Sequence, residues 1–160
     1  MKYILMFTLF AFLSLNVKGQ DAEKVKLYNP KENAEKNIEK AKAIAKANKK
    51  HIFIQGGGNW CGWCIKFHNF IKEDEELKAA FEEKFVAVKL NYSPENKNEA
   101  LFKKYGNAQR FGFPVFIILD DNGERIHTQN SALLEEGKGY NKAKVLGFLN
   151  NWSYEAIRQE

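Results

Sequence analysis

The sequence predicts a single α/β domain in which one mixed β-sheet carries helices on both faces. Short apolar runs rich in β-branched residues alternate with segments of helical periodicity, and hairpin-turn residues separate the last two runs. Strands that alternate with helices favour parallel βαβ units, and a final hairpin adds an antiparallel edge. At 160 residues the chain is long enough for one domain with a real core.

The first predicted element is an additional helix that precedes the first strand. Asn29 is a candidate N-cap, followed by Pro30 at the first helical position and by Glu32 three residues after the cap. We expect this helix to end near residues 48–50. Its apolar stripe would consist of Ala34, Ile38, Ala41 and Ala45.

The first predicted strand is residues 51–54 (HIFI), a β-branched and aromatic run. The three glycines at residues 56–58 would then let the chain turn sharply into a second helix. That helix should begin near Cys61 and continue to about residue 71. Its inward face would carry Cys64, Phe67 and Ile71.

A third helix and a second strand should follow. Asp74 can cap the helix. Residues 85–90 (FVAVKL) are nearly continuously apolar, which favours a strand covered on both faces. Ser93 and Pro94 would open the next helix, and Gly106 would close it. The inward residues of the third helix would be Leu77, Ala80 and Phe81.

The last predicted elements are a hairpin and a helix. Residues 115–119 (VFIIL) form a strand, and the Asp-Asn-Gly turn at residues 121–123 should pair it with residues 125–129. We expect a loop over residues 130–140 and a final helix capped by Asn141. The stripe of that helix would be Val145, Phe148, Leu149 and Trp152.

The first nineteen residues have the pattern of a secretory signal peptide. Lys2 precedes an apolar run over residues 3–15, which is shorter than the roughly 20 residues of a membrane span. Val17 and Gly19 have the small side chains that cleavage before Gln20 requires. This pattern predicts an exported protein, either periplasmic or secreted. The alternative is an uncleaved N-terminal anchor.

The charge pattern argues against a nucleic-acid-binding protein. Removing Lys2 and Lys18 with the signal leaves 23 basic and 20 acidic residues, so that the formal charge falls from +5 to +3. The lysines are also interleaved with glutamates along the chain, as on solvated helix faces.

Two cysteines, Cys61 and Cys64, are the only ones in the chain and leave three interpretations open. A structural disulfide across so short a loop would stabilise the fold by only about 2 kcal/mol. A closed zinc site usually needs four ligands, and only His68 lies near enough in sequence to add a third. The third interpretation is a redox-active pair, because a Cys-x-x-Cys near a βαβ pattern favours thiol–disulfide chemistry.

The predicted position of the cysteines suits redox chemistry. A cysteine at a helix N-terminus lies among unpaired N–H groups at the positive end of the helix dipole, and both favour the nucleophilic thiolate. Cys61 would occupy that end, nearest solvent. Cys64 would lie one turn further in and would be less exposed, in a position to resolve a mixed disulfide on Cys61.

The stretch Trp60-Cys61-Gly62-Trp63-Cys64 resembles the W-C-G-x-C active site of the thioredoxin superfamily. The resemblance covers roughly residues 48–157. Within the superfamily, the chain most resembles small secreted or periplasmic proteins of the disulfide isomerase and reductase kind. The other matching positions are Lys89-Leu90-Asn91, Gly112-Phe113-Pro114 and Asn122-Gly123-Glu124.

The resemblance implies a thioredoxin fold over residues 20–160 and a set of roles. Cys61 would be the attacking thiol and Cys64 the resolving thiol. Pro114 would form a cis peptide bond after Phe113 and leave the Phe113 backbone free to pair with an extended substrate. A proline at the first residue of a strand is the alternative for Pro114. The substrate-binding residues would be Trp60, Gly62, Trp63, Phe113 and Pro114.

The two tryptophans could form an apolar rim for unfolded chain. Ordinary packing is the alternative for both, and it is the less favoured one for Trp63, which lies between the cysteines and should be near solvent.

Two positions depart from the common pattern of the superfamily. Thioredoxins carry a buried aspartate six residues before the first cysteine, where this chain has Gln55. Lys89 matches the lysine of the superfamily but lacks that aspartate as a partner. We therefore expect proton transfer at Cys64 to depend on water or on another group. The second departure is Trp63, which stands where reducing thioredoxins have proline and many oxidants and isomerases have histidine.

The sequence thus predicts a thiol–disulfide oxidoreductase that acts on exported, cysteine-containing proteins, with the direction of electron flow left open. No metal and no dissociable cofactor is expected. A membrane electron-transfer protein or a second soluble thioredoxin-like protein would reset the pair, and we expect a monomer. The alternative is a redox-sensitive module that binds client peptides with little turnover.

Overall fold

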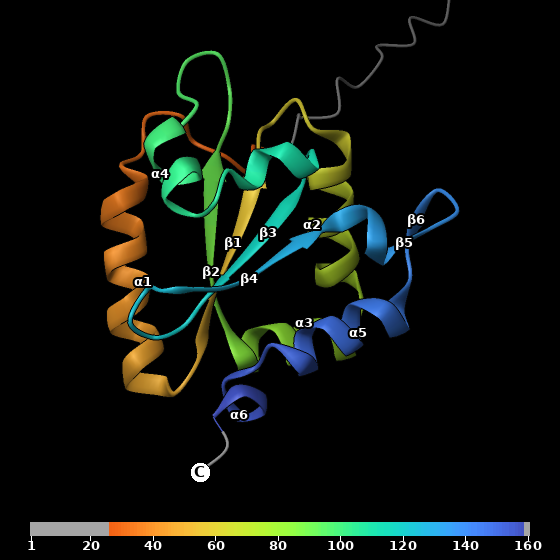
Figure 1. Ribbon diagram of the computed structural model, residues 1–160. Helices are drawn as coiled ribbons and strands as arrows, with labels where there is room; N and C mark the ends of the chain where they lie inside the picture. Colours follow the sequence, from red (N-terminus) through yellow and green to blue (C-terminus); the bar gives the residue numbers. More distant parts are fainter. Residues whose placement is uncertain (1–25, 159–160) are drawn as a thin grey trace, which may run out of the picture.

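The computed structural model describes residues 26–158 and contains a four-stranded sheet flanked by helices (Figure 1). The order of the strands is β2-β1-β3-β4, with β1 parallel to β2 and the other pairs antiparallel. The predicted mixed sheet is confirmed. The strands are β1 (His51–Gly57), β2 (Phe85–Asn91), β3 (Val115–Leu119) and β4 (Arg125–Asn130).

The direction of β3 differs from the parallel arrangement that alternation predicted. Between β2 and β3 the chain forms α4 (Glu99–Lys104) and the 3-10 helix η1 (Ala108–Phe111). Six helical residues span about 9 Å, whereas a seven-residue strand spans about 23 Å. The helix within residues 92–114 is too short to carry the chain back along the sheet, and β3 starts at the end where β2 finishes and runs antiparallel to β1.

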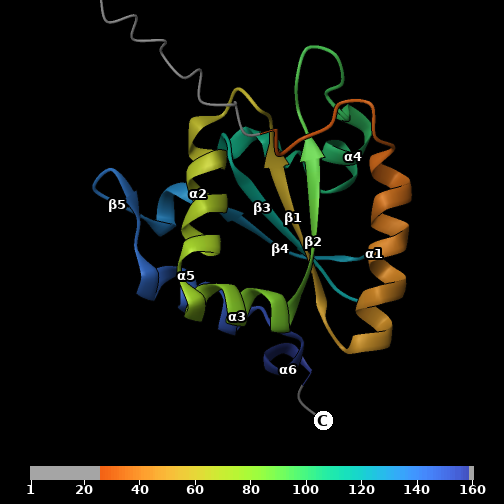
Figure 2. The same cartoon turned by 180° about the vertical axis from the view of Figure 1, so that it is seen from behind.

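Helices cover both faces of the sheet (Figure 2), and the sheet separates two hydrophobic cores. On one face, α1 (Ala34–Asn48) and α4 pack against aliphatic side chains of β1, β2 and β3. On the other face, α2 (Gly62–Glu73), α3 (Glu75–Lys84) and α5 (Lys142–Asn151) enclose an aromatic core centred on Phe53 and Phe116. No helix in the described range is long and apolar enough to cross a membrane. The proposed signal peptide lies outside the described residues.

Several predicted helix boundaries are confirmed by their caps. Asp74 accepts the backbone N–H groups of Glu76 and Leu77 at 3.1 Å each, and Asn141 accepts that of Lys144 at 2.9 Å. Helix α4 ends before Gly106, which has φ of 79° and therefore the left-handed conformation that suits glycine. The predicted inward face of α2 is the buried one.

The start of α1 is a correction. The helix begins one turn later than predicted, because Asn33 rather than Asn29 accepts the N–H of Lys36, at 2.9 Å. Asn29 instead accepts the N–H of Lys31 at 3.0 Å in a local turn. The residues that precede α1 therefore form a separate segment, residues 26–33, which we term the strap.

The start of α4 is a second correction. Ser93 and Asn96 exchange two backbone hydrogen bonds of 3.1 Å and form an isolated bridge where a helix was predicted. The helix begins only after Asn98, which has φ of 48°. The helix-opening pattern of Ser93 and Pro94 is overridden because the Asn91 amide also bonds to the Ser93 hydroxyl, at 3.0 Å.

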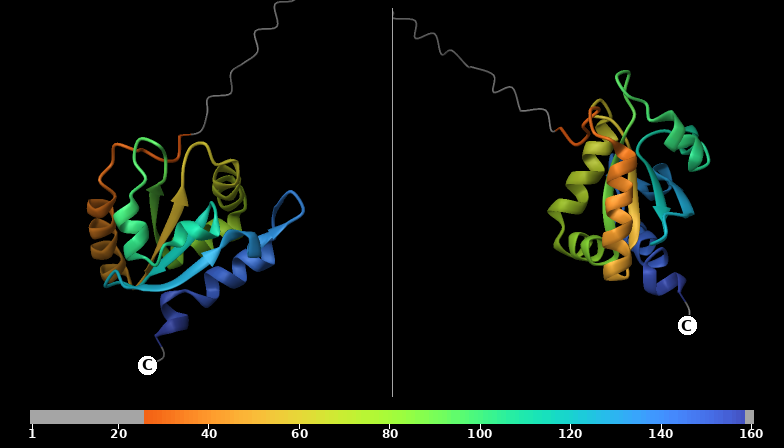
Figure 3. Two further views of the ribbon diagram at one scale, coloured as in Figure 1. Left: turned by 45° about the horizontal axis from the view of Figure 1, so that its top comes forward. Right: turned by 90° about the vertical axis from the view of Figure 1, so that its left-hand side faces the viewer.

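Three smaller features of the fold also differ from the prediction. Strand β1 includes Gly56 and Gly57, so that only Gly58 is left to begin the turn. Ala87 is exposed because β2 is an edge strand, and the strand is therefore not covered on both faces as predicted. Residues 130–140 are not a plain loop. They contain the 3-10 helix η2 (Ser131–Leu134) and a short hairpin of β5 (Glu135–Glu136) and β6 (Gly139–Tyr140) beside α2 (Figure 3). A last short helix, α6, is Tyr154–Ile157.

Candidate active site

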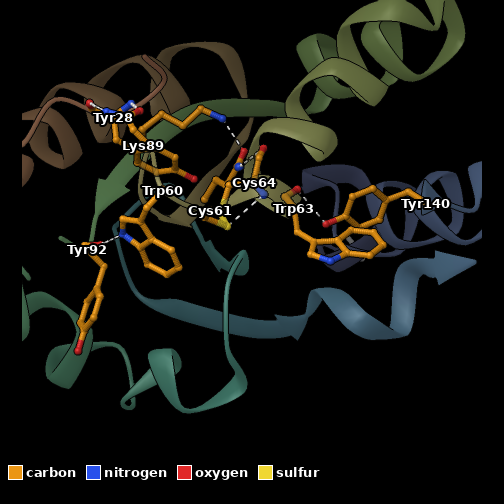
Figure 4. The surroundings of a disulfide bond; sticks show 10 residues. Tyr28, Trp60, Cys61, Trp63, Cys64, Lys89, Tyr92 and Tyr140 are labelled. Carbon is orange, nitrogen blue, oxygen red and sulfur yellow. Dashed lines mark hydrogen bonds between the residues drawn. A yellow bond between two sulfur atoms is a disulfide. The ribbon is translucent and has the colours of Figure 1, made fainter. Parts of the chain in front are cut away.

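The two cysteines lie at the start of α2, beyond the end of β1, and form a disulfide (Figure 4). Cys61 is the N-cap residue, and its Sγ atom accepts the backbone N–H of Cys64 at 3.1 Å. Cys61 is 4% exposed and Cys64 is fully buried. The order of exposure agrees with the prediction, but Cys61 offers solvent only a small part of its surface.

This position has a direct chemical consequence for Cys61. Its sulfur faces the unpaired N–H groups and the positive dipole end of a 12-residue helix. When the disulfide is opened, the same groups would stabilise a thiolate on Cys61. The geometry therefore suits a nucleophilic sulfur at this position.

One side of the disulfide carries three aromatic residues, Trp60, Tyr92 and Phe113, which we term the aromatic ledge. Trp60 is 58% exposed, and its indole N–H donates to the Tyr92 carbonyl oxygen at 2.8 Å. The Phe113 ring packs against the rings of Trp60 and Tyr92, at centroid distances of 5.6 and 4.9 Å. The Phe113–Pro114 peptide bond is cis, and Phe113 also packs against the two cysteines and Tyr28.

Trp63 lies on the other side of the disulfide and is more buried than Trp60, although it was expected near solvent. It is half-buried, with its ring edge-on to Tyr140 at 5.5 Å and its carbonyl accepting the Tyr140 hydroxyl at 3.3 Å. The Lys66 ammonium lies 4.2 Å from the centroid of the Trp63 ring. Trp63 is therefore held by packing, and Trp60 is the tryptophan that faces solvent. Gly62 is exposed, and nothing lies within 4 Å of the space where a side chain would start.

Gln55 and Lys89 lie beneath the inner cysteine. The buried Gln55 side chain donates from Nε2 to the Cys64 carbonyl oxygen at 3.0 Å, and its Oε1 atom accepts a hydrogen bond from the Lys89 ammonium. Burial lowers the pKa of Lys89 to about 8. Lys89 thus has a neutral amide as its partner where the superfamily pattern would provide a carboxylate.

Sequence reasoning missed Tyr28, which packs directly against the disulfide. Its ring is buried with Cys61 and Cys64 in one small cluster, although it belongs to the strap before α1. Asn59 holds the strap there by two hydrogen bonds to the Tyr28 backbone. No local pattern could reveal a contact between residues 31 positions apart.

The remaining candidate metal ligand near the cysteines is His68. Within residues 26–158 no three His, Cys, Asp or Glu side chains are grouped to hold a metal ion. His68 lies on α2 beyond Cys64, and its pKa is lowered by burial first and then by the charges of Lys89 and Lys72.

Comparisons with known proteins agree with this architecture. A family model described as a thioredoxin-like domain matches residues 38–136. A disulphide isomerase from Xylella fastidiosa Temecula1 has a similar structure, with a TM-score of 0.70 and 20% identity over 79% of this chain and 96% of that one. The DsbD C-terminal domain of Neisseria meningitidis in its oxidised form has a TM-score of 0.53 and 19% identity, over 75% and 96%.

A thioredoxin-fold protein from Helicobacter pylori has a TM-score of 0.50 and 22% identity, over 70% of this chain and 76% of that one. No curated protein sequence matches the chain closely enough to be reported as a relative. The predicted thioredoxin fold is confirmed by the family model and by the arrangement of the sheet and helices.

Proposed function

Because the chain belongs to the thioredoxin-like family, we propose that it is a thiol–disulfide oxidoreductase acting on cysteine-containing exported proteins. One observation carries the proposal: the Cys61–Cys64 disulfide lies at the N-terminus of α2, where the Cys64 N–H already points at the Cys61 sulfur. A pair held in this way can be opened and closed without moving the helix.

The proposed exchange proceeds through a mixed disulfide. In the reducing direction, the Cys61 thiolate attacks a substrate disulfide, and one substrate sulfur leaves as a thiolate. The Cys64 thiolate then attacks the Cys61 sulfur and releases the second substrate thiolate. Two electrons pass from the cysteine pair to the substrate, and the pair becomes a disulfide. Oxidation of a substrate is the same sequence in reverse.

The proposed substrate is an extended segment of a protein chain. The aromatic ledge offers exposed apolar surface beside Cys61, and the Phe113 backbone lies at the start of β3 next to the disulfide. Trp60, Phe113 and Pro114 would contact the substrate, together with Gly62, whose open surroundings leave room for a chain. Trp63 would act by supporting the cysteine loop from the side of Tyr140.

The remaining parts of the proposal concern the cellular setting. Residues 1–19 would direct export and residues 20–160 would form the mature domain, acting as a monomer in the periplasm or outside the cell. The chemistry requires no cofactor beyond the cysteine pair. A redox partner, either a membrane electron-transfer protein or a second soluble thioredoxin-like protein, would reset it.

The test is turnover of a protein disulfide by the chain without residues 1–19. We expect the protein to reduce or reshuffle such a substrate and both Cys61→Ser and Cys64→Ser to abolish turnover. Only Cys64→Ser should accumulate a covalent substrate adduct, because its mixed disulfide on Cys61 cannot be resolved. Binding of unfolded chains in both redox states without turnover would instead establish a binding module.

Equilibration with defined glutathione mixtures would assign the direction. A potential near the −270 mV of thioredoxin, within about 30 mV, favours a reductase. A potential nearer the roughly −180 to −120 mV of isomerase and oxidising catalysts favours those activities.

A further inference from the structure

The strap is fixed across the active site at two points. It crosses the carboxyl ends of β1 and β2 on its way to α1 (Figure 2). At Tyr28, the side-chain amide of Asn59 accepts the backbone N–H at 2.9 Å and donates to the backbone carbonyl oxygen at 2.7 Å. At Pro30, the carbonyl oxygen accepts a hydrogen bond from the Asn96 amide at 3.0 Å. These bonds set the position of the Tyr28 side chain.

The Tyr28 hydroxyl group borders the same small space as the inner sulfur. A methyl group at Gly57 would lie 2.4 Å from Cys64 Sγ and 2.7 Å from the Tyr28 hydroxyl oxygen. Tyr28 is only 3% exposed, and within residues 26–158 its hydroxyl has no hydrogen-bond partner. The nearby Gln55 side chain is engaged at both ends, by the Cys64 carbonyl and by Lys89.

A buried hydroxyl without a partner is unfavourable, because it has lost its bonds to water and gained none in exchange. In the disulfide state the neighbouring sulfur is neutral and a weak acceptor. In the reduced state a thiolate on Cys64 would be a charged acceptor, and hydrogen bonds to charged groups are about twice as strong as those between neutral groups. The hydroxyl therefore has its natural partner only after the disulfide opens.

We propose that the Tyr28 hydroxyl donates a hydrogen bond to the Cys64 thiolate when the Cys61–Cys64 disulfide opens. The inference rests on the proposed function. When an incoming thiolate attacks Cys61, the disulfide breaks and its electron pair stays on the Cys64 sulfur, where the hydroxyl stabilises it. The phenolic proton remains on Tyr28. The strap thus supplies a hydrogen-bond donor that Gln55 does not, because the Gln55 side chain is already bonded to the Cys64 carbonyl oxygen and to Lys89.

The protonation state of Tyr28 agrees with a donor role. Burial raises the pKa of Tyr28 above its ordinary value of about 10, and the proximity of Gln55 only partly offsets this effect. Tyr28 therefore keeps its proton at neutral pH. The other titratable groups around this space are Lys89 on β2, Tyr140 on β6, whose charge bears on Tyr28, and His68 on α2, whose charge interacts with Lys89.

The test measures the pKa of Cys64 directly, in a Cys61→Ser background that leaves one thiol. Carbon-13 NMR of labelled cysteine follows ionisation without relying on turnover. We expect Tyr28→Phe, which keeps the ring and removes only the hydroxyl, to raise the pKa of Cys64 by about one unit, a tenfold weaker ionisation. Tyr28→Phe should raise the pKa of Cys64 equally in a Lys89→Met background, because the Tyr28 hydroxyl does not act through the lysine.

Tyr105→Phe is the matched control, since it also removes a buried hydroxyl but lies in the aliphatic core on the other face of the sheet. It should leave the pKa of Cys64 unchanged. If Tyr28→Phe fails to fold, Asn59→Ala, which releases the clamp on the strap, should raise the pKa in the same direction.

An unchanged Cys64 pKa in a folded Tyr28→Phe protein, or an equal rise in Tyr105→Phe, overturns the inference. The result is separable from the proposed function. A shifted pKa in a protein that exchanges no disulfides would refute only the oxidoreductase activity, and normal turnover with an unshifted pKa would refute only the role of Tyr28.

Discussion

The Lys89 ammonium donates a hydrogen bond to the side-chain oxygen of Gln55, and the Gln55 amide in turn donates to the Cys64 carbonyl oxygen. A single neutral side chain therefore connects a half-buried cation on β2 with the backbone of the inner cysteine on α2. Replacing Gln55 by a side chain of the same shape but a different charge would therefore change the electrostatics around Cys64 without changing the packing.

Gln55→Glu should raise the pKa of Cys64 and shift the pH profile of substrate reduction to higher pH by about one unit. The substitution keeps the length of the side chain but places a negative charge near a developing thiolate, and like charges disfavour ionisation. Steady-state rates of protein disulfide reduction against pH would measure the shift. Gln129→Glu on β4 is the control, because Gln129 lies in another strand and bonds to His127 rather than to the cysteine loop. Coincident profiles for Gln55→Glu and wild type would contradict this account.

Lys89 should make stability rise with pH in the alkaline range. Its pKa is about 8 in the folded protein and about 10.4 in an unfolded chain, so the unfolded state binds more protons between these values. The free energy of unfolding should therefore increase from pH 8 to pH 10 by the order of 1 kcal/mol. Above pH 10 the trend should reverse, because burial raises the pKa values of Tyr28 and Tyr140 in the folded state. Urea denaturation of the oxidised protein at several pH values would measure both effects.

Lys89→Met should flatten the rise between pH 8 and pH 10, whereas replacement of the exposed Lys46 should preserve it. A rise of equal size in Lys89→Met would show that another group titrates in this window.

Gly57→Ala should destabilise the protein by about 2–3 kcal/mol. The added methyl group would lie 2.4 Å from Cys64 Sγ and 2.7 Å from the Tyr28 hydroxyl oxygen. Neither atom can move away easily, because the disulfide fixes the sulfur and the Asn59 hydrogen bonds fix the strap. Gly62→Ala is the matched control. Nothing lies within 4 Å of its added methyl group, and alanine is the better helix residue, so it should be neutral or stabilising by up to about 1 kcal/mol. Denaturation midpoints that fail to separate the two variants would disprove the close packing at Gly57.

Trp60→Ala should weaken the reduction of a protein disulfide about tenfold while leaving that of a small disulfide unchanged. Exposed aromatic side chains contribute strongly to recognition, and a tenfold loss corresponds to about 1.4 kcal/mol. Because Trp60 is 58% exposed, stability should change by less than about 1 kcal/mol. Ile44→Ala on α1, which is 51% exposed, should affect neither substrate. Equal losses on both substrates would assign Trp60 to the chemistry of the cysteines instead.

The parts of the fold that could be predicted from the sequence are those governed by neighbours along the chain. Asp74 and Asn141 cap helices because their oxygens reach N–H groups two or three residues later. The buried stripe of α2 follows from helical spacing alone. The hairpin of β3 and β4 follows from its turn, in which Gly123 has φ of 88°.

The parts that could not be predicted depend on residues far away in sequence. Asn29 and Asn33 both suit a helix cap, and the choice between them depends on the strap, which Asn59 and Asn96 hold in place before α1. Trp63 is packed because Tyr140, 77 residues later, covers it. Within the site, the position of the cysteine pair at the start of a helix follows from local sequence, whereas Tyr28 gave no local signal.

The central position of β1 governs the order in which the domain can be assembled during synthesis. This strand leads directly to the cysteines, but its two neighbours in the sheet, β2 and β3, come later in the sequence. The residue of β3 that pairs with β1 and is synthesised last is Leu119. A growing chain therefore presents both thiols to its surroundings well before the sheet beneath them can close. Contacts between such distant segments form late because the loop between them must first be ordered. The cysteines, only three residues apart, need no such closure, and so they can meet an oxidant or a foreign thiol while the rest of the domain is still being made.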